Sequence, residues 1–122
     1  MSGMSQLSEF EKLVRSYYSL VDRNRVDDLL SLFSNDIYYR RCRKEINGIA
    51  ELSRFYHAER QLEGRHSILR VLGDQQNLIA IEGSFIGYSD GQPINIQFVD
   101  VFLFDGNSKV CQRHTYSDQG NV

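Results

Sequence analysis

Residues 95–104 read Asn-Ile-Gln-Phe-Val-Asp-Val-Phe-Leu-Phe, and this stretch decides the fold. It is rich in β-branched and aromatic residues, which favour strands, and alternate side chains of a strand point to opposite faces of a sheet. One face carries Ile96, Phe98, Asp100, Phe102 and Phe104. The other face carries Asn95, Gln97, Val99, Val101 and Leu103. The stretch therefore predicts a long strand whose more apolar face holds a single carboxyl group.

That carboxyl group, on Asp100, is the unusual feature of the strand. A carboxylate among aromatic side chains is costly to bury unless it is paired or protonated. Two interpretations follow from this cost. Asp100 is a structural aspartate paired with an arginine, or it is a pocket acid whose pKa is raised so that it stays neutral and donates a hydrogen bond.

Three further strand-like segments occur in the second half of the chain, at residues 67–72, 78–88 and 109–117. Turn-forming residues lie between the segments, at Gly73-Asp74, at Ser89-Asp90-Gly91 and at residues 105–108. Short polar turns of this kind join antiparallel neighbours. The second half therefore predicts a run of antiparallel hairpins.

The first half of the chain has helical spacing instead. Apolar residues recur every three or four positions over residues 7–21, which predicts a helix with Ser5 or Ser8 as its N-terminal cap. Residues 26–33 repeat the spacing and predict a second, short helix.

A turn at residues 34–36 and a strand at residues 37–41 are expected next. Asn47-Gly48 then begins a third helix, and its buried side is expected to hold Ile49, Leu52, Phe55 and Tyr56. Helices first and antiparallel strands afterwards predict an α+β fold, in which a curved antiparallel sheet is wrapped around three N-terminal helices.

Length and composition narrow the class of protein. The chain has 122 residues, of which 41% are hydrophobic and 25% charged, so we expect one globular domain over residues 1–122. A formal net charge of −2 gives no general basic field, so neither nucleic acid nor a membrane surface is an expected partner. Two cysteines without metal or redox spacing, and the absence of a long apolar run, favour the cytoplasm.

Four short matches point to a family. They are Tyr17 within Tyr-Tyr-Ser-Leu-Val-Asp, residues 91–93 (Gly-Gln-Pro), residues 99–101 (Val-Asp-Val) and Phe104-Asp105. With the order of elements, they make nearly the whole chain resemble the nuclear transport factor 2-like superfamily of cone-shaped domains. Within it the chain is most similar to bacterial ketosteroid isomerases, with SnoaL-like polyketide cyclases and limonene epoxide hydrolases as relatives.

The resemblance implies roles for particular residues. In ketosteroid isomerases a helix tyrosine and a strand aspartic acid stabilise a dienolate, and these match Tyr17 and Asp100. The carboxylate base of the isomerases falls on Arg41, which cannot accept a proton. The last-strand aspartate of the cyclases and hydrolases falls on Thr115. The hydrolases also have an Arg/Asp pair on the middle strand, where the only acidic residue of this chain is Glu82. Three known chemistries of the fold therefore each lack a central residue.

A substrate pocket is nevertheless expected around Tyr17 and Asp100. Its further lining residues are expected to be Tyr39, Arg41, Phe55, Phe85, Phe98, Phe102, Arg113 and Thr115. If Arg41 faces Asp100, its guanidinium favours the ionised carboxylate and opposes the pKa rise that burial causes. Such a pair suits a ligand with a carboxylate, enolate or phenolate oxygen; alternatively, the two residues form a structural salt bridge.

His66 is the remaining candidate for moving protons. It opens the strand after the third helix, near the point where several relatives, scytalone dehydratase among them, have a catalytic histidine. The second histidine of that dehydratase has no counterpart here. We expect His57 at the surface and His114 to point away from the pocket. No two histidines have metal-ligand spacing, so we expect neither a metal nor another cofactor.

Two functions stay open at this point. The protein is a small-molecule enzyme, an isomerase, dehydratase or cyclase that acts on a polycyclic or conjugated ketone, with Tyr17 and Asp100 holding the oxygen and His66 or a water moving protons. Alternatively, it is a non-catalytic ligand-binding or assembly domain, whose pocket holds an apolar molecule or is filled by its own aromatic side chains.

The outer face of the long strand predicts self-association. Val99, Val101 and Leu103 are apolar although they lie on the side away from the helices. An exposed patch of this kind marks a partner surface. Together with the dimerising habit of the family, it predicts a homodimer joined through the sheet faces.

Overall fold

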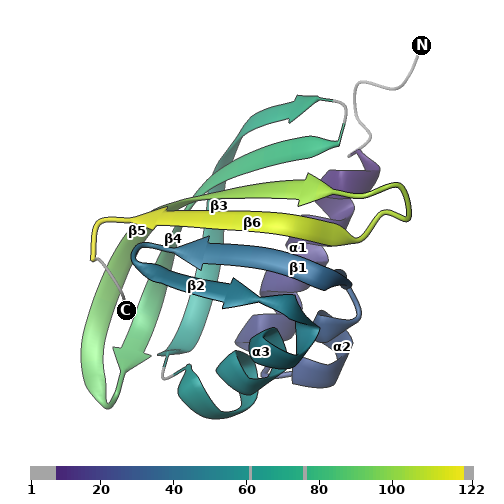
Figure 1. Cartoon of the computed structure of the whole chain (residues 1–122). Coiled ribbons are helices and arrows are strands. Elements are labelled where there is room, and N and C mark those ends of the chain that lie inside the picture. The colour runs from purple at the N-terminus through teal and green to yellow at the C-terminus, as the bar shows by residue number, and fades with distance from the viewer. Residues whose placement is uncertain (1–7, 61, 76, 120–122) are drawn as a thin grey trace.

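The computed structural model of the chain describes residues 8–60, 62–75 and 77–119, and Figure 1 shows its helices and strands. The first elements are α1 (Glu9–Asp22), α2 (Val26–Leu30), β1 (Phe33–Arg41) and β2 (Lys44–Asn47). Helix α3 (Gly48–Arg54) continues into the π-helical turn η2 (Phe55–Glu59). The long strands that follow are β3 (Leu62–Gln75), β4 (Leu78–Ser89), β5 (Gln92–Phe104) and β6 (Val110–Ser117).

The six strands form one sheet in the order β2-β1-β6-β5-β4-β3. The sheet curves without closing, and the helices gather on one side of it, as expected (Figure 1). Helix α1 packs against β3, and α3 packs against β1. One pair departs from the antiparallel pattern, because β1 and β6 are parallel. The turn residues predict hairpins, and a hairpin joins only consecutive strands in antiparallel order. Because β1 and β6 are far apart in the chain, no hairpin joins them, and the turn residues do not predict how they pair.

Helix α1 forms where the apolar spacing predicts it. Its cap is Ser8, whose side-chain oxygen accepts a hydrogen bond from the backbone N–H of Glu11 at 2.9 Å. The alternative cap Ser5 lies outside the described residues. The buried side of α1 holds Val14, Tyr17, Tyr18 and Val21. In the described part of the chain, no helix is long and apolar enough to span a membrane.

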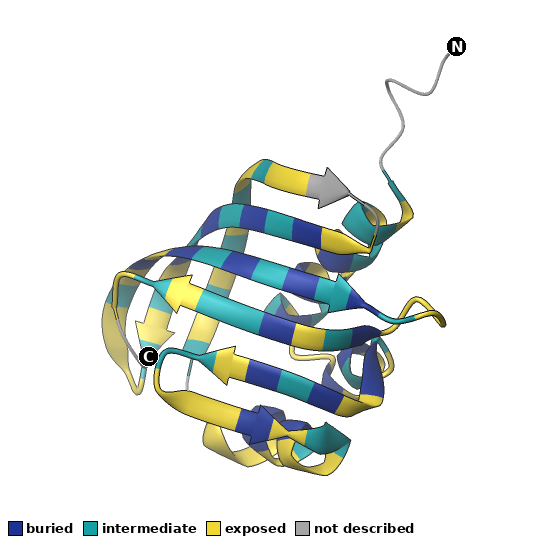
Figure 2. Ribbon diagram, turned by 45° about the horizontal axis from the view of Figure 1, so that its top comes forward, coloured by how far each residue is buried: buried dark blue, intermediate teal, exposed yellow. Residues whose placement is uncertain are grey.

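The core lies between the helices and the concave face of the sheet, and the strands alternate between buried and exposed positions (Figure 2). Along β5, the predicted inner face is buried: Ile96, Phe98, Asp100, Phe102 and Phe104. The outer residues Val99, Val101 and Leu103 are half-buried. The face assignment is therefore confirmed.

Four local predictions are wrong. The second helix, expected over residues 26–33, ends at Leu30. Residues 34–36, expected as a turn, belong to β1, because pairing of Phe33 with Val110 on β6 already begins the strand there. Gly73 and Asp74, also expected as a turn, continue β3 along β4. Strand β2 was not predicted, although Lys44 pairs with Arg41 after a tight turn. In the last three cases strand pairing outweighs the local preference of the residues.

Candidate functional site

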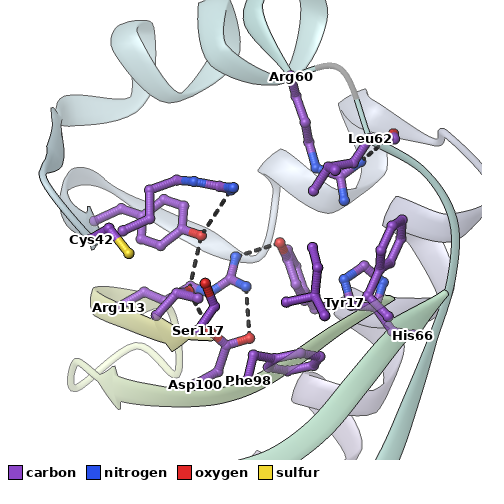
Figure 3. Close-up of a pocket in the computed structure, with 14 residues that line it drawn as sticks. Tyr17, Cys42, Arg60, Leu62, His66, Phe98, Asp100, Arg113 and Ser117 are labelled. Carbon is purple, nitrogen blue, oxygen red and sulfur yellow. Dashed lines mark hydrogen bonds and ion pairs between the residues drawn. The ribbon is translucent and has the colours of Figure 1, made fainter. Parts of the chain in front are cut away.

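A cavity lies between α1, the segment that follows η2 and the concave face of the sheet, and Figure 3 shows the side chains of its wall. Of the residues predicted for the pocket, those in its wall are Tyr17, Tyr39, Arg41, His66, Phe85, Phe98, Asp100, Arg113 and Thr115. The cavity volume is about 40 Å³, and a bound water needs roughly 10–15 Å³ of such space. The cavity therefore has room for a few water molecules.

Asp100 and Arg113 form a buried ion pair in the wall of this cavity. Arg113 Nη2 lies 2.8 Å from Asp100 Oδ2, and their side chains are 4% and 1% exposed. Asp100 also accepts hydrogen bonds from the hydroxyls of Tyr18 and Thr115. The arginine that pairs with Asp100 is therefore Arg113, in place of the pairing with Arg41 that the sequence left open. Arg113 reaches the carboxylate because β5 and β6 are neighbours in the sheet.

The partners of Asp100 decide its protonation state. Burial alone would raise its pKa, but the Arg113 guanidinium and the hydrogen bonds from Thr115 and Tyr18 outweigh burial and hold the pKa below the ordinary 3.8. The carboxylate is therefore ionised at neutral pH. This favours the paired structural aspartate over the neutral hydrogen-bond donor.

Three tyrosines surround the Arg113 guanidinium. Nη1 donates to the hydroxyl of Tyr17 and, at 3.1 Å, to that of Tyr56. Its Cζ lies 4.4 Å from the ring centroid of Tyr17 and 4.5 Å from that of Tyr39. Nε is a buried donor without a hydrogen-bond partner among the described residues. An orphaned donor of this kind is satisfied by a bound water or a ligand oxygen.

Tyr17 and Tyr56 share one hydrogen bond between their hydroxyls. Burial raises the pKa of both groups above the ordinary 10.0, more than the nearby Arg113 lowers it. Both hydroxyls therefore keep their protons at neutral pH. The pair has two hydroxyl protons, and one of them lies in the hydrogen bond between the two oxygens. The other O–H can donate to a ligand.

A chain of hydroxyls connects Arg41 with Asp100. Arg41 Nη1 donates to the Tyr39 hydroxyl at 3.4 Å. That hydroxyl lies 3.0 Å from Thr115 Oγ1, and Thr115 donates to Asp100. Arg41 Cζ also lies 4.9 Å from the ring centroid of Phe55. Arg41, itself in the cavity wall, is therefore connected to Asp100 through Tyr39 and Thr115.

His66, on β3, is oriented by Asp22 at the end of α1. Its Nδ1 lies 2.5 Å from Asp22 Oδ1, and its backbone N–H donates to Oδ2 at 2.8 Å. A carboxylate acceptor at Nδ1 favours the tautomer that carries its proton there and leaves Nε2 as an acceptor. Burial lowers the pKa of His66 from 6.5, more than Asp22 raises it. The ring is therefore neutral at pH 7.

Two predicted lining residues lie behind the cavity wall. Phe102 is fully buried, and its ring centroid is 5.9 Å from that of Tyr17 and 5.0 Å from Arg113 Cζ. Phe55 packs edge-on against Tyr39 with a centroid distance of 6.3 Å. Both support residues of the wall without lining it themselves.

The other histidines lie where expected. His57 is half exposed, with Nε2 3.4 Å from Asp27 Oδ1. His114 alternates with the wall residue Thr115 and stacks on Tyr116 at a centroid distance of 4.0 Å. In the described ranges, no three His, Cys, Asp or Glu side chains gather in a way that could hold a metal ion.

Several residues of the site were missed. The cavity wall also includes Cys42, Arg60, Leu62, Ile96 and Ser117. Ile96 lies an even number of positions from Asp100, and Ser117 an even number from Thr115. Strand alternation could therefore have placed both residues on the cavity side. The helical spacing of Tyr18 from Val14 and Val21 could likewise have placed Tyr18 on the buried side of α1. No sequence signal connects Asp22 with His66, because they are 44 residues apart.

Comparisons with known proteins agree with this architecture. Residues 14–112 match the family model described as a SnoaL-like domain. A search of the curated proteins found no match. A similar solved structure is that of SalBIII, described as an epoxide hydrolase/cyclase-like enzyme in pyran ring formation of the polyether salinomycin. It has a TM-score of 0.80 and 16% identity, over 89% of this chain and 90% of that chain, which shows a shared fold.

Proposed function

The chain belongs to the family of SnoaL-like domains, and on this premise we propose that it is a small-molecule enzyme of the isomerase, dehydratase or cyclase type acting on a conjugated ketone. One observation carries the proposal. His66, oriented by Asp22, lines the same cavity as the donors Tyr17 and Arg113. A base and an oxyanion site that face one cavity are the two groups that enolisation of a ketone needs.

In this mechanism, the ketone oxygen accepts hydrogen bonds from the Tyr17–Tyr56 pair and from Arg113. Nε2 of His66 removes a proton from the saturated carbon next to the carbonyl group, or from the γ carbon of an enone. The electron pair of the broken C–H bond moves to the oxygen and forms an enolate. Protonated His66 then returns the proton to another carbon in an isomerisation, or to a leaving hydroxyl in a dehydration.

Asp100 has a different role from the one that the resemblance implies. As an ionised carboxylate it has no proton to donate to a ketone oxygen. It accepts from Tyr18, Thr115 and Arg113. We therefore assign it as a positioning residue, which holds the Arg113 guanidinium against the cavity.

The second candidate function is non-catalytic ligand binding. The small cavity favours it, because about 40 Å³ does not admit a polycyclic ligand between the present side chains. The small cavity volume also limits how much of a substrate the enzyme can enclose. The cavity admits the reacting end of a ketone, and the rest of the molecule lies outside it.

The test is deuterium exchange of 2-cyclohexen-1-one in D₂O, followed by ¹H NMR. We expect the protein to accelerate loss of the enolisable protons, and His66→Gln to reduce this catalysed rate by about 10²–10⁴-fold, the usual contribution of a general base. The matched control is His57→Gln, the same change at a half-exposed histidine, which leaves the rate unchanged.

Two results contradict the proposal. Exchange by His66→Gln at the wild-type rate means that His66 is not the base. Wild-type exchange at the buffer rate, with binding of the same ketone visible as shifts of protein resonances, supports the non-catalytic alternative.

A further inference from the structure

The cavity wall is positively charged, although the whole chain has a formal net charge of −2. It contains the guanidiniums of Arg41, Arg60 and Arg113 and one carboxylate, that of Asp100. Asp100 is paired with Arg113. The guanidiniums in the wall therefore outnumber its carboxylate while His66 is neutral. An excess of one charge sign in a cavity with low-dielectric walls attracts ligands of the opposite sign.

Arg60 is the cation best placed to meet such a ligand. It follows η2 and reaches toward the cavity from the side opposite Asp100 (Figure 3). Its Nη1 donates to the backbone carbonyl of Leu62 at 3.0 Å, and its Cζ lies 5.9 Å from the Phe85 ring centroid. None of the ion pairs found among the described residues includes Arg60. A guanidinium has five N–H donors, so most of them remain for a ligand.

The charge of Arg60 is close to the groups that we assign to chemistry. Burial raises the pKa of the Tyr17 and Tyr56 hydroxyls, and the positive charge of Arg60 lowers the pKa of both. Burial lowers the pKa of His66, and Arg60 acts in the same direction. An anion bound at Arg60 offsets this charge and therefore makes His66 a stronger base.

A groove beside the cavity supplies the space that the cavity lacks. Arg60 and Leu62 line both hollows, so the two adjoin at these residues. The groove has a volume of about 660 Å³, within the range of roughly 300–1,000 Å³ that is usual for small-molecule sites. Val26 and Tyr56 contribute apolar surface to the groove, and Asp22, Arg23 and Glu63 are its charged lining residues besides Arg60. A ligand with its reacting end in the cavity has its remaining atoms in this groove and passes Arg60.

From these observations we infer that the substrate is a keto acid, whose carboxylate is bound by Arg60 where the cavity meets the groove. The inference rests on the proposed function for the ketone end of the substrate. The carboxylate subsite itself rests on the position of Arg60, the excess charge and the adjoining groove. It is therefore open to a binding measurement that does not depend on turnover.

The experiment compares two ketones of the same shape, 4-acetylbenzoate and the uncharged 4-acetylbenzamide. NMR titration gives the dissociation constant of each, and deuterium exchange of the acetyl protons reports catalysis. We expect the wild type to bind the benzoate about 10–100-fold more tightly than the benzamide, as charge-assisted hydrogen bonds imply. Arg60→Gln loses this preference, because the benzoate loses more affinity than the benzamide. Arg60→Lys keeps part of the preference because it keeps the charge.

The matched control is Arg65→Gln, the same change at an exposed arginine of β3, which leaves both constants unchanged. Equal binding of the two ketones by the wild type, no binding of either, or an unchanged preference in Arg60→Gln overturns the inference. Selective benzoate binding without proton exchange supports the carboxylate subsite and contradicts the proposed chemistry, so the two failures are distinguishable.

Discussion

Asp100 shows, at the scale of single residues, that partners rather than burial decide the charge of an inner carboxyl group. Its side chain is 1% exposed, and burial by itself favours the neutral acid. Arg113, Thr115 and Tyr18 all stabilise the ionised form. Because a buried pair repays its desolvation only when the remaining lone pairs are satisfied, the two hydroxyls are as necessary to this carboxylate as the guanidinium.

Replacement of Asp100 is therefore expected to destabilise the fold. Asp100→Ala leaves the Arg113 charge buried without a counter-charge, so we expect a loss of about 3–5 kcal/mol in the free energy of unfolding. Asp100→Asn keeps an acceptor but loses the charge, so we expect a loss of about 1–3 kcal/mol. Urea unfolding measures both. Asp27→Ala, at a side chain that is 93% exposed, serves as the control, and losses no larger than the control's contradict a buried ion pair.

His66 is expected to make stability depend on pH. Its pKa is lowered from 6.5 in the folded protein, so the unfolded chain binds this proton first as the pH falls. The free energy of unfolding therefore decreases as the pH falls below about 6.5 toward the folded-state pKa, and it is fully retained above 6.5. The charged groups that influence the ring are Asp22, Arg60 and Asp100.

Chemical unfolding of the wild type and of His66→Gln between pH 8 and pH 5 measures this contribution. We expect the decrease below pH 6.5 to be smaller in His66→Gln, because glutamine does not titrate, and to persist in His57→Gln. Parallel curves for the wild type and His66→Gln contradict a depressed pKa of His66.

At the scale of elements, the registers of three strands assemble the charged part of the site. Antiparallel pairing places Thr115 on β6 beside Asp100 on β5. Parallel pairing places the same Thr115 beside Arg41 on β1. One residue of β6 therefore lies between the carboxylate and the outer arginine, which is why these two act on each other through hydroxyl groups.

The pairing of β4 with β5 predicts that a methyl group added at Gly83 destabilises the fold. Gly83 on β4 lies opposite Phe98 on β5. A Cβ atom at Gly83 would lie 2.7 Å from Phe98 Cζ and 2.7 Å from the backbone oxygen of Ser67. Since the backbone contact cannot move easily, we expect Gly83→Ala to cost about 1–3 kcal/mol, as overpacking does, and to displace the Phe98 ring in the cavity wall.

Thermal unfolding and the aromatic ¹H NMR signals of Phe98 report these two effects. Gly73→Ala is the control, because a Cβ atom there meets nothing within 4 Å, and we expect a change within about 0.5 kcal/mol. Equal stability of the two variants contradicts the close packing of Phe98 on Gly83.

At the scale of the whole molecule, the outer face of the sheet carries apolar residues on three strands, with Glu82, Gln112 and His114 beside them. Strand pairing places Leu78 beside Leu103, and Tyr116 beside Val99, on this face. Leu78 and Tyr116 are 45% and 54% exposed. Large exposed apolar patches are uncommon on monomers. This arrangement supports our proposal of a homodimer joined through the sheet faces.

Sedimentation at micromolar concentration tests the proposal, and we expect a dimer. Val101→Lys places a charge in the middle of the patch and is expected to shift the protein toward the monomer. Ala50→Lys adds the same charge at an exposed position of α3 and is expected to leave the dimer intact. A wild-type monomer contradicts the proposal.

The sequence by itself determined which faces of β5 and of α1 are buried. The alternation around Asp100 predicts which face of β5 is buried, and the spacing around Tyr17 predicts the inner side of α1. Both predictions rest on the periods of the backbone, which are the same in every protein. The local matches around Tyr17 and Asp100 likewise predicted the family, and residues 14–112 match its model.

Only the tertiary structure decided which groups meet. Arg41 and Arg113 were both predicted for the pocket, and the strand order makes Arg113 the partner of Asp100. Asp22 reaches His66 across 44 residues of chain. The cavity volume depends on how side chains from several elements pack together. Periodicity assigns a residue to a face, whereas its partners follow from strand order, register and packing, which no local pattern contains.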